Sequence, residues 1–181
     1  KVFANDFLSR TRGLDSEHGF INNLAVFMFA PKFYKKPLIL KVEPYENWHV
    51  TTGLDNYNNE PNTFYAPDYD YFADCPIEIG TQTDFDFEVK GIKHTISIFG
   101  EAKYDKQRLI KDFTTIIEKN FDFWGSVPYK HYTFIVHCTQ QSGVGAEHIN
   151  STVVGVKPQA FETEAGYESF VGKIPAPQAY G

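Results

Sequence analysis

The sequence predicts an α+β fold that is mostly β, with an antiparallel β-sandwich-like domain over residues 1–101 and a second domain that begins at residue 102. Three observations predict this fold. Short apolar or alternating runs fill the first hundred residues, a helical period begins near residue 104, and the 181 residues include 17 Phe and 11 Tyr. Aromatic side chains favour strands and build large cores. The length allows one compact domain, or one domain plus part of a second.

Four strands are predicted in the first part of the chain, at residues 24–29, 37–42, 85–90 and 94–99. The first two runs are short and largely apolar. The third alternates strictly between apolar and charged side chains, which is the pattern of a half-buried strand. Gly91 permits a tight turn after it, so that the third and fourth strands are expected to form a hairpin.

A helix is predicted where apolar side chains recur at helical spacing, at Leu109, Ile110, Phe113, Ile116, Ile117, Phe121 and Trp124. Asp105 is suited to cap its first turn, and Gly125 is suited to end it. Beyond this helix we expect a strand at residues 132–138, an extended segment at 146–154 and a further helix at 161–171.

Composition excludes several classes of protein. With 17 basic and 23 acidic residues the net charge is −6, so that the surface is expected to repel phosphate backbones and nucleic acid is not an expected partner. No apolar run is long enough to form a transmembrane helix, which takes about 20 residues. Two cysteines, Cys75 and Cys138, are too few for a disulfide framework and are expected to be buried thiols.

The chain begins with Lys1 and not with Met, so its natural amino terminus and any signal peptide are expected to lie outside the sequence. Both a periplasmic or secreted location and a cytoplasmic one fit this expectation.

Potential metal ligands are present, but none lies in a recognised ligand pattern. Zinc peptidases place two His four residues apart on a helix with Glu beside the first, and no His in this sequence is followed by Glu. His131 and His137 share a strand face, yet six residues of strand separate them by roughly 20 Å. They and His94 are therefore expected to be structural. So are three aspartates that lack the Gly and the terminal Glu of an EF-hand loop, namely Asp68, Asp70 and Asp74.

A glycine-rich segment followed by a carboxylate is the one pattern that suggests binding chemistry. Gly143 and Gly145 expose main chain beside the predicted extended segment, and Glu147 follows almost at once. A peptide can add to such an edge through main-chain hydrogen bonds. The carboxylate would then bind the ammonium group at the peptide's amino end. A surface hairpin without function is the alternative at this point.

Residues 143–153 resemble the G-G-G-L-E-H-x-N-S-T motif of the glycyl aminopeptidase family, which comprises gluzincin metallopeptidases related to aminopeptidase N. Further resemblances follow in the family's order, at residues 47–54, 69–80 and 124–134. The resemblance therefore covers most of the chain. Ala146 stands where the family has Leu, and Val144 where it has Gly.

The resemblance implies a role for each matched position. Glu147 is similar to the glutamate that binds the free amine of the substrate. Gly143, Gly145 and Ala146 would offer main-chain groups to the peptide, and His148 would help to hold the strand.

The same resemblance implies that residues 102–181 are the beginning of a thermolysin-like catalytic domain. In the family a zinc-binding helix with His-Glu-x-x-His follows the motif, whereas here a Pro-rich segment stands after Gly172. We therefore expect zinc in the intact protein, but no metal ligand and no catalytic residue in this fragment, which should be inactive alone. Its expected partners are a peptide substrate and the rest of the catalytic domain.

Two other functions remain open from the residues. The aromatic content also fits a non-catalytic β-sandwich module that binds carbohydrate or protein, with Trp48 and Tyr57 available to stack on sugars. A structural domain with no ligand is the third hypothesis.

Overall fold

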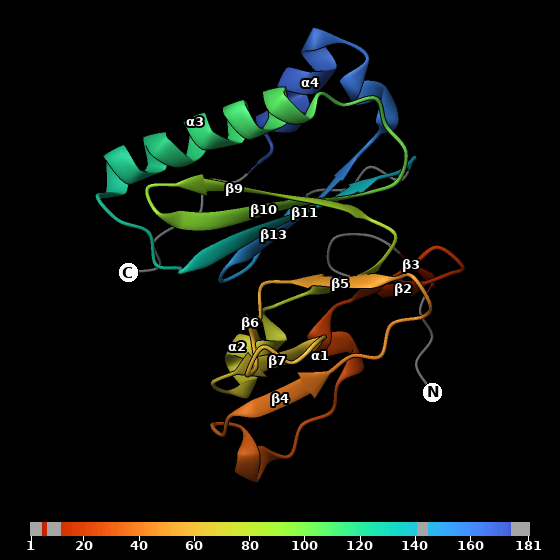
Figure 1. Ribbon diagram of the computed structural model, residues 1–181, viewed down its shortest axis with the longest axis vertical. Coiled ribbons are helices and arrows are strands. Elements are labelled where there is room, and N and C mark those ends of the chain that lie inside the picture. The colour runs from red at the N-terminus through yellow and green to blue at the C-terminus, as the bar shows by residue number, and fades with distance from the viewer. Residues whose placement is uncertain (1–4, 7–11, 141–144, 175–181) are drawn as a thin grey trace. The chain divides into compact units, whose positions relative to one another are not determined.

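The computed structural model describes residues 5–6, 12–140 and 145–174 (Figure 1). The chain divides into two compact units, Lys1–Gln82 (unit 1) and Thr83–Gly181 (unit 2). Within the described residues the fold is α+β and mostly β, with three sheets and four α-helices. This confirms the predicted class.

The described residues of unit 1 form two antiparallel sheets. The larger has the order β1-β2-β3-β8-β5, formed by Asn5–Asp6, Arg12–Leu14, His18–Ile21, Ile77–Gly80 and His49–Thr52. The smaller has the order β4-β7-β6, formed by Leu38–Lys41, Thr63–Ala66 and Asp55–Asn56. Three short helices complete the described part of this unit: α1 (Asn23–Val26), the 3-10 helix η1 (Pro31–Phe33) and α2 (Tyr69–Ala73). A core that includes Phe64, Phe72 and Cys75 packs beneath the smaller sheet.

A buried polar pair fixes the centre of the larger sheet, where β3 and β8 are paired. The imidazole Nδ1 of His18 lies 2.7 Å from the Glu78 carboxylate, and both side chains are buried. Gly80 lies opposite His18 in the same strand pair, and a Cβ at Gly80 would lie 2.6 Å from the His18 Cβ. The two strands can approach this closely only because residue 80 has no side chain.

The predicted strand at residues 24–29 is wrong. Its first part forms α1, which Asn22 caps by accepting a hydrogen bond from the Leu24 amide. The side chain of buried Asn23 donates to the carbonyls of Phe72 and Cys75, at 2.7 Å each. The local cap from Asn22 and the distant contacts of Asn23 together override the strand preference of the apolar run, and Met28 is left 97% exposed.

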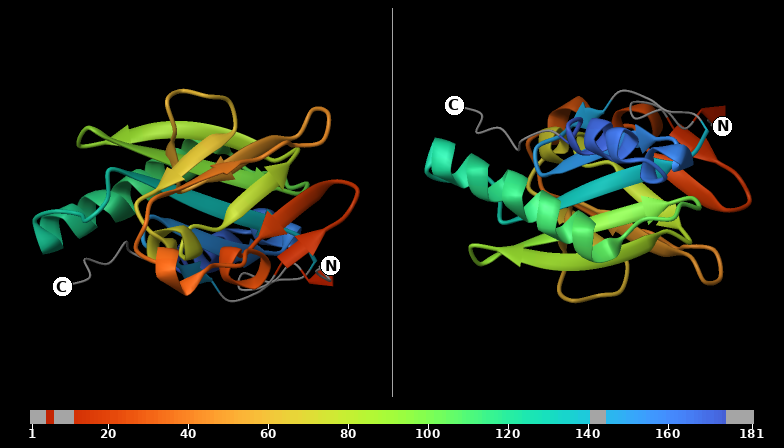
Figure 2. Two further views of the ribbon diagram at one scale, coloured as in Figure 1. Left: turned by 90° about the horizontal axis from the view of Figure 1, so that it is seen from below. Right: turned by 90° about the horizontal axis from the view of Figure 1, so that it is seen from above.

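Unit 2 is a mixed sheet with helices on one face. Its elements are β9 (Thr83–Val89), β10 (Ile92–Phe99), α3 (Lys106–Trp124), β11 (His131–Cys138), β12 (Ala146–Glu147), β13 (Ser151–Val156), the 3-10 helix η2 (Pro158–Phe161) and α4 (Glu164–Val171). The strand order is β12-β13-β11-β10-β9, in which the three inner strands are parallel and each outer strand is antiparallel to its neighbour. Figure 2 shows α3 and α4 side by side over the same face.

The helix predicted after residue 105 is confirmed as α3. Asp105 caps it by accepting from two amides of the first turn, and Gly125 ends it with a left-handed conformation, φ 76°. Leu109, Phe113 and Ile117 are fully buried against the sheet, as their helical spacing predicts. The hairpin of β9 and β10 and the strand at residues 132–138 are also confirmed.

The compact units divide at a different point from the predicted boundary at residues 101 and 102. The hydrophobic period of the sequence changes near the predicted boundary, because α3 begins there. The β9–β10 hairpin, however, pairs with β11 through β10 in parallel register, so that it is part of unit 2. The boundary between functional domains stays a prediction.

Gly100 should be far less replaceable than Gly91, although both flank β10 with positive φ, 96° and 80°. A Cβ at Gly91 would have no atom within 4 Å, whereas at Gly100 it would lie 2.0 Å from the Cys138 carbonyl oxygen. We expect Gly91→Ala to cost about 1 kcal/mol from its backbone conformation alone. Gly100→Ala should cost on the order of 3 kcal/mol or more, since the β10–β11 pair must also shift. Urea denaturation measures both, and equal losses would contradict the packing described here.

A candidate peptide-binding edge

Strand β12 lies at one edge of the unit 2 sheet. It pairs only with β13 among the described strands, with Ala146 opposite Val153 and Glu147 opposite Thr152. The predicted single extended segment at 146–154 is therefore a hairpin of two strands. Since β13 pairs with β11 on its other side, β12 is the outer strand at this end of the sheet among the described strands.

The main chain of Glu147 faces this open edge. The His148 amide donates to the Ser151 carbonyl at 2.8 Å, so that the polar groups of residue 148 point towards β13. Along an antiparallel strand the hydrogen-bonding direction alternates from one residue to the next. The N–H and C=O of Glu147 therefore point away from β13, where an added strand can pair with them.

The side chains of β12 divide between the two faces of the sheet. Ala146 is 4% exposed and packs into the protein, whereas Glu147 is exposed. Among the described residues no ion pair is formed by the Glu147 carboxylate. An anionic acceptor thus stands beside backbone that pairs with no further strand of the described residues, which is an arrangement able to bind an ammonium group.

A tyrosine hydroxyl anchors the hairpin that carries this edge. The buried Tyr132 Oη donates to the Ser151 carbonyl at 3.0 Å and lies 2.6 Å from Thr152 Oγ1, whose hydroxyl can donate to it in turn. The Thr133 amide donates to the Asn150 carbonyl at 3.0 Å. Ser151 and Thr152 are completely buried. The turn between β12 and β13 is therefore held against β11.

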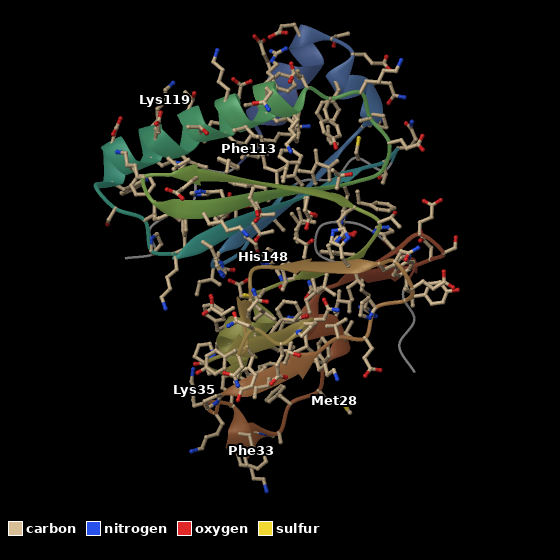
Figure 3. The ribbon with its side chains drawn as sticks, viewed as in Figure 1. Met28, Phe33, Lys35, Phe113, Lys119 and His148 are labelled. Carbon is tan, nitrogen blue, oxygen red and sulfur yellow. The ribbon has the colours of Figure 1, made fainter. Side chains whose placement is uncertain are left out.

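The remaining predicted site residues lie close by, with one exception. Gly145 leads directly into β12, and a Cβ there would lie 3.3 Å from Val154 Cγ2, so that a side chain would press on β13. His148 is half-buried after β12, and Figure 3 places it on the side of the sheet away from α3. Gly143 lies outside the described residues.

Three of the residues that were expected to be structural, His94, Asp68 and Asp70, have structural partners. His94 is fully buried, with Nδ1 2.9 Å from the Ile92 carbonyl and Nε2 3.3 Å from the Tyr129 hydroxyl. Asp68 caps α2 by accepting from the Tyr71 amide. Asp70 accepts from the Tyr34 hydroxyl and from Lys35. Both cysteines are buried free thiols, and burial raises the pKa of Cys138 to about 11.

Unit 1 contains a cavity that the sequence did not reveal. It has a volume of about 400 Å³, and its lining includes Phe20, Ile21 and Ile79 from the larger sheet. Trp48 and Tyr45 also line it, with their rings edge to face and the centroids 6.0 Å apart. The cavity is mainly apolar, and its residues come from segments that are distant in the sequence.

Solved structures place the fold among aminopeptidase relatives. An aminopeptidase N family protein from Idiomarina loihiensis matches 93% of this chain with a TM-score of 0.87 and 28% sequence identity. An M1 zinc metallopeptidase from Deinococcus radiodurans matches 86% of the chain with a TM-score of 0.52 and 9% identity, which indicates a shared fold only. The chain spans 31% and 39% of the lengths of these two proteins.

The particular family follows from the sequence of unit 1. Residues 1–81 match the Peptidase M61 N-terminal domain. The N-terminal part of the chain thus matches the M61, or glycyl aminopeptidase, family, as its motifs suggested. No curated protein matches the chain.

The buried His94 should make unit 2 sensitive to acid. Desolvation lowers the pKa of His94 to about 4, whereas the unfolded chain takes up this proton near pH 6.5. Between these two pH values His94 is protonated in the unfolded state but not in the folded state. The free energy of unfolding is therefore at its highest above pH 6.5 and falls by roughly 3 kcal/mol as the pH drops to 4. Urea denaturation from pH 7.5 to 4.5 measures the loss. His94→Asn can still donate to the Ile92 carbonyl and should flatten this dependence; an unchanged pH dependence in the variant would contradict the assignment.

Proposed function

We propose that the chain is the N-terminal part of a zinc-dependent aminopeptidase, and that β12 binds the amino end of a peptide substrate. The observation that carries the proposal is Glu147 itself. Its side chain is exposed and its main chain faces the open edge of β12. A peptide that adds to this edge pairs with the backbone of Glu147 and brings its ammonium group to the carboxylate.

The neighbouring residues would set the register of the peptide. Gly145 and Ala146 would offer main-chain groups at the approach to the edge, while His148 would hold the end of β12. By binding the ammonium group, the glutamate would place the first peptide bond of the substrate at the cleavage site. An aminopeptidase requires this placement because it removes one residue from the amino end. The family of residues 1–81 supports this proposal.

We assign residues 1–101 to a β-sandwich-like N-terminal domain and residues 102–181 to the start of a thermolysin-like catalytic domain. Zinc would be bound by the rest of that domain, because this sequence has no His-Glu-x-x-His segment. When bound, zinc polarises the scissile carbonyl and activates water. The 181-residue chain alone should therefore cleave no peptide, and the remaining catalytic domain would be its partner within the same protein.

In the intact enzyme, Glu147→Gln should lower kcat/KM for peptides with a free amino end by about 10- to 100-fold. The substitution removes one charge-assisted hydrogen bond while it keeps the size of the side chain. Peptides with an acetylated amino end should be cleaved no worse than by the unmodified enzyme. Parallel kinetics on both peptide series check this difference.

Glu162→Gln is the matched control, since Glu162 is also an exposed carboxylate of unit 2 but lies outside β12. It should leave both peptide series unchanged. Equal kinetics of the Glu147 variant and the unmodified enzyme on free and blocked peptides would remove the proposed role.

The second candidate is a non-catalytic module that binds carbohydrate or protein. The cavity beside Trp48 favours it, because aromatic rings at the edge of an apolar pocket can stack on sugars. Tyr57, the other aromatic considered, is half-buried.

A pull-down on insoluble polysaccharide separates the two candidates. The aminopeptidase proposal predicts that the chain stays in the supernatant. Retention that Trp48→Ala abolishes, with no effect of Glu147→Gln, would favour the binding module instead.

A further inference from the structure

The longest apolar run in the sequence lies on the surface of unit 1. Residues 24–29 were expected to form a strand, yet the segment from α1 to β4 leaves five large apolar side chains exposed: Met28 97%, Leu24 68%, Phe33 56%, Ile39 53% and Phe29 52%. Figure 3 shows Met28 and Phe33 projecting at the same end of unit 1. We call residues 24–41 the apolar tip. So many exposed apolar side chains in one segment mark an interaction surface.

The charge of the apolar tip is of one sign. Its 18 residues include four lysines, Lys32, Lys35, Lys36 and Lys41, and no acidic residue, although the whole chain has a net charge of −6. Lys32 Nζ lies 4.8 Å from the centroid of the Phe33 ring, so that an ammonium group stands beside an exposed aromatic side chain. Lys35 is already paired with Asp70 and Asp68, whereas Lys32 and Lys36 are exposed.

Aromatic packing supports the tip from behind. The rings of Phe29 and Tyr34 lie 4.6 and 5.5 Å, centroid to centroid, from that of Tyr69 in α2. The Tyr69 hydroxyl donates to the Phe27 carbonyl at 3.2 Å. A hollow of about 270 Å³ opens among these side chains, with Met28, Phe33 and Lys36 in its lining. The exposed side chains are thus presented by a packed loop.

We propose that the apolar tip binds the surface of an anionic lipid bilayer. Met28 and Phe33 would enter the boundary between headgroups and acyl chains, and Lys32 and Lys36 would reach the lipid phosphates beside them. The choice of a lipid surface rests on complementarity, because exposed ammonium groups of the tip lie beside its exposed apolar side chains, as Lys32 lies beside Phe33. No described helix is long and apolar enough to cross a membrane.

Vesicle sedimentation of the 181-residue chain tests the proposal. The chain should sediment with vesicles of phosphatidylcholine that contain a quarter of phosphatidylglycerol, and much less with pure phosphatidylcholine. The double substitution Lys32→Glu with Lys36→Glu should weaken binding by at least about 25-fold, since each lysine near an anionic surface contributes about fivefold. Added salt should weaken the unmodified chain in the same direction.

Apolar variants test insertion separately from charge. Salt screens the contribution of the lysines, so that the vesicle binding that remains at high salt comes from the inserted apolar side chains. The double substitution Met28→Ser with Phe33→Ser should abolish this remaining binding. Phe123→Ser is the matched control, because Phe123 is 77% exposed at the end of α3 and lies outside the tip. All these side chains are exposed, and circular dichroism confirms that each variant is folded.

Three results would overturn the proposal: no sedimentation with anionic vesicles, equal sedimentation of the Met28 and Phe33 variant, or a dimer in solution that this variant abolishes. The last would assign the tip to a contact between two copies of the chain. None of these results bears on Glu147, so that the peptide-binding proposal stands or falls separately.

Discussion

The Tyr132 hydroxyl is the contact on which the candidate site depends. It bonds to the main chain of Ser151 and to the hydroxyl of Thr152 inside the protein, and so fixes the point at which β13 begins beside β11. From that point the register of the hairpin follows, and a shift of one residue would exchange the faces of Ala146 and Glu147. An exposed carboxylate at the edge is thus the consequence of a buried hydroxyl two strands away.

Much of unit 2 could be predicted from the sequence, because its patterns are local. The alternation of β9, the helical spacing of α3 and its caps at Asp105 and Gly125 each need only neighbouring residues to take effect. The hairpin of β12 and β13 was read as one segment because its turn residues, His148 to Asn150, carry no strong turn signal such as Asn-Gly.

Unit 1 was harder to predict because its decisive contacts join distant residues. Asn23 holds carbonyls about 50 positions along the chain, and His18 meets Glu78 across two strands. No periodicity announces such pairs, so that the local pattern at 24–29 predicts a strand. The motif that contains Glu78 and Gly80 suggested a family. The physical reason for Gly80 in this motif, the close approach of β3 and β8, is visible only in the structure.

The most direct test of the account is a nitrogen-15 NMR titration of the 181-residue chain with a short peptide, with its amino end first free and then acetylated. Recognition by β12 predicts that the free-amine peptide shifts the amide signals of residues 145–148 more than any others, and that acetylation removes most of the effect. Shifts centred elsewhere, or equal shifts with both peptides, would show that the carboxylate at this edge does not bind the amino end of a peptide.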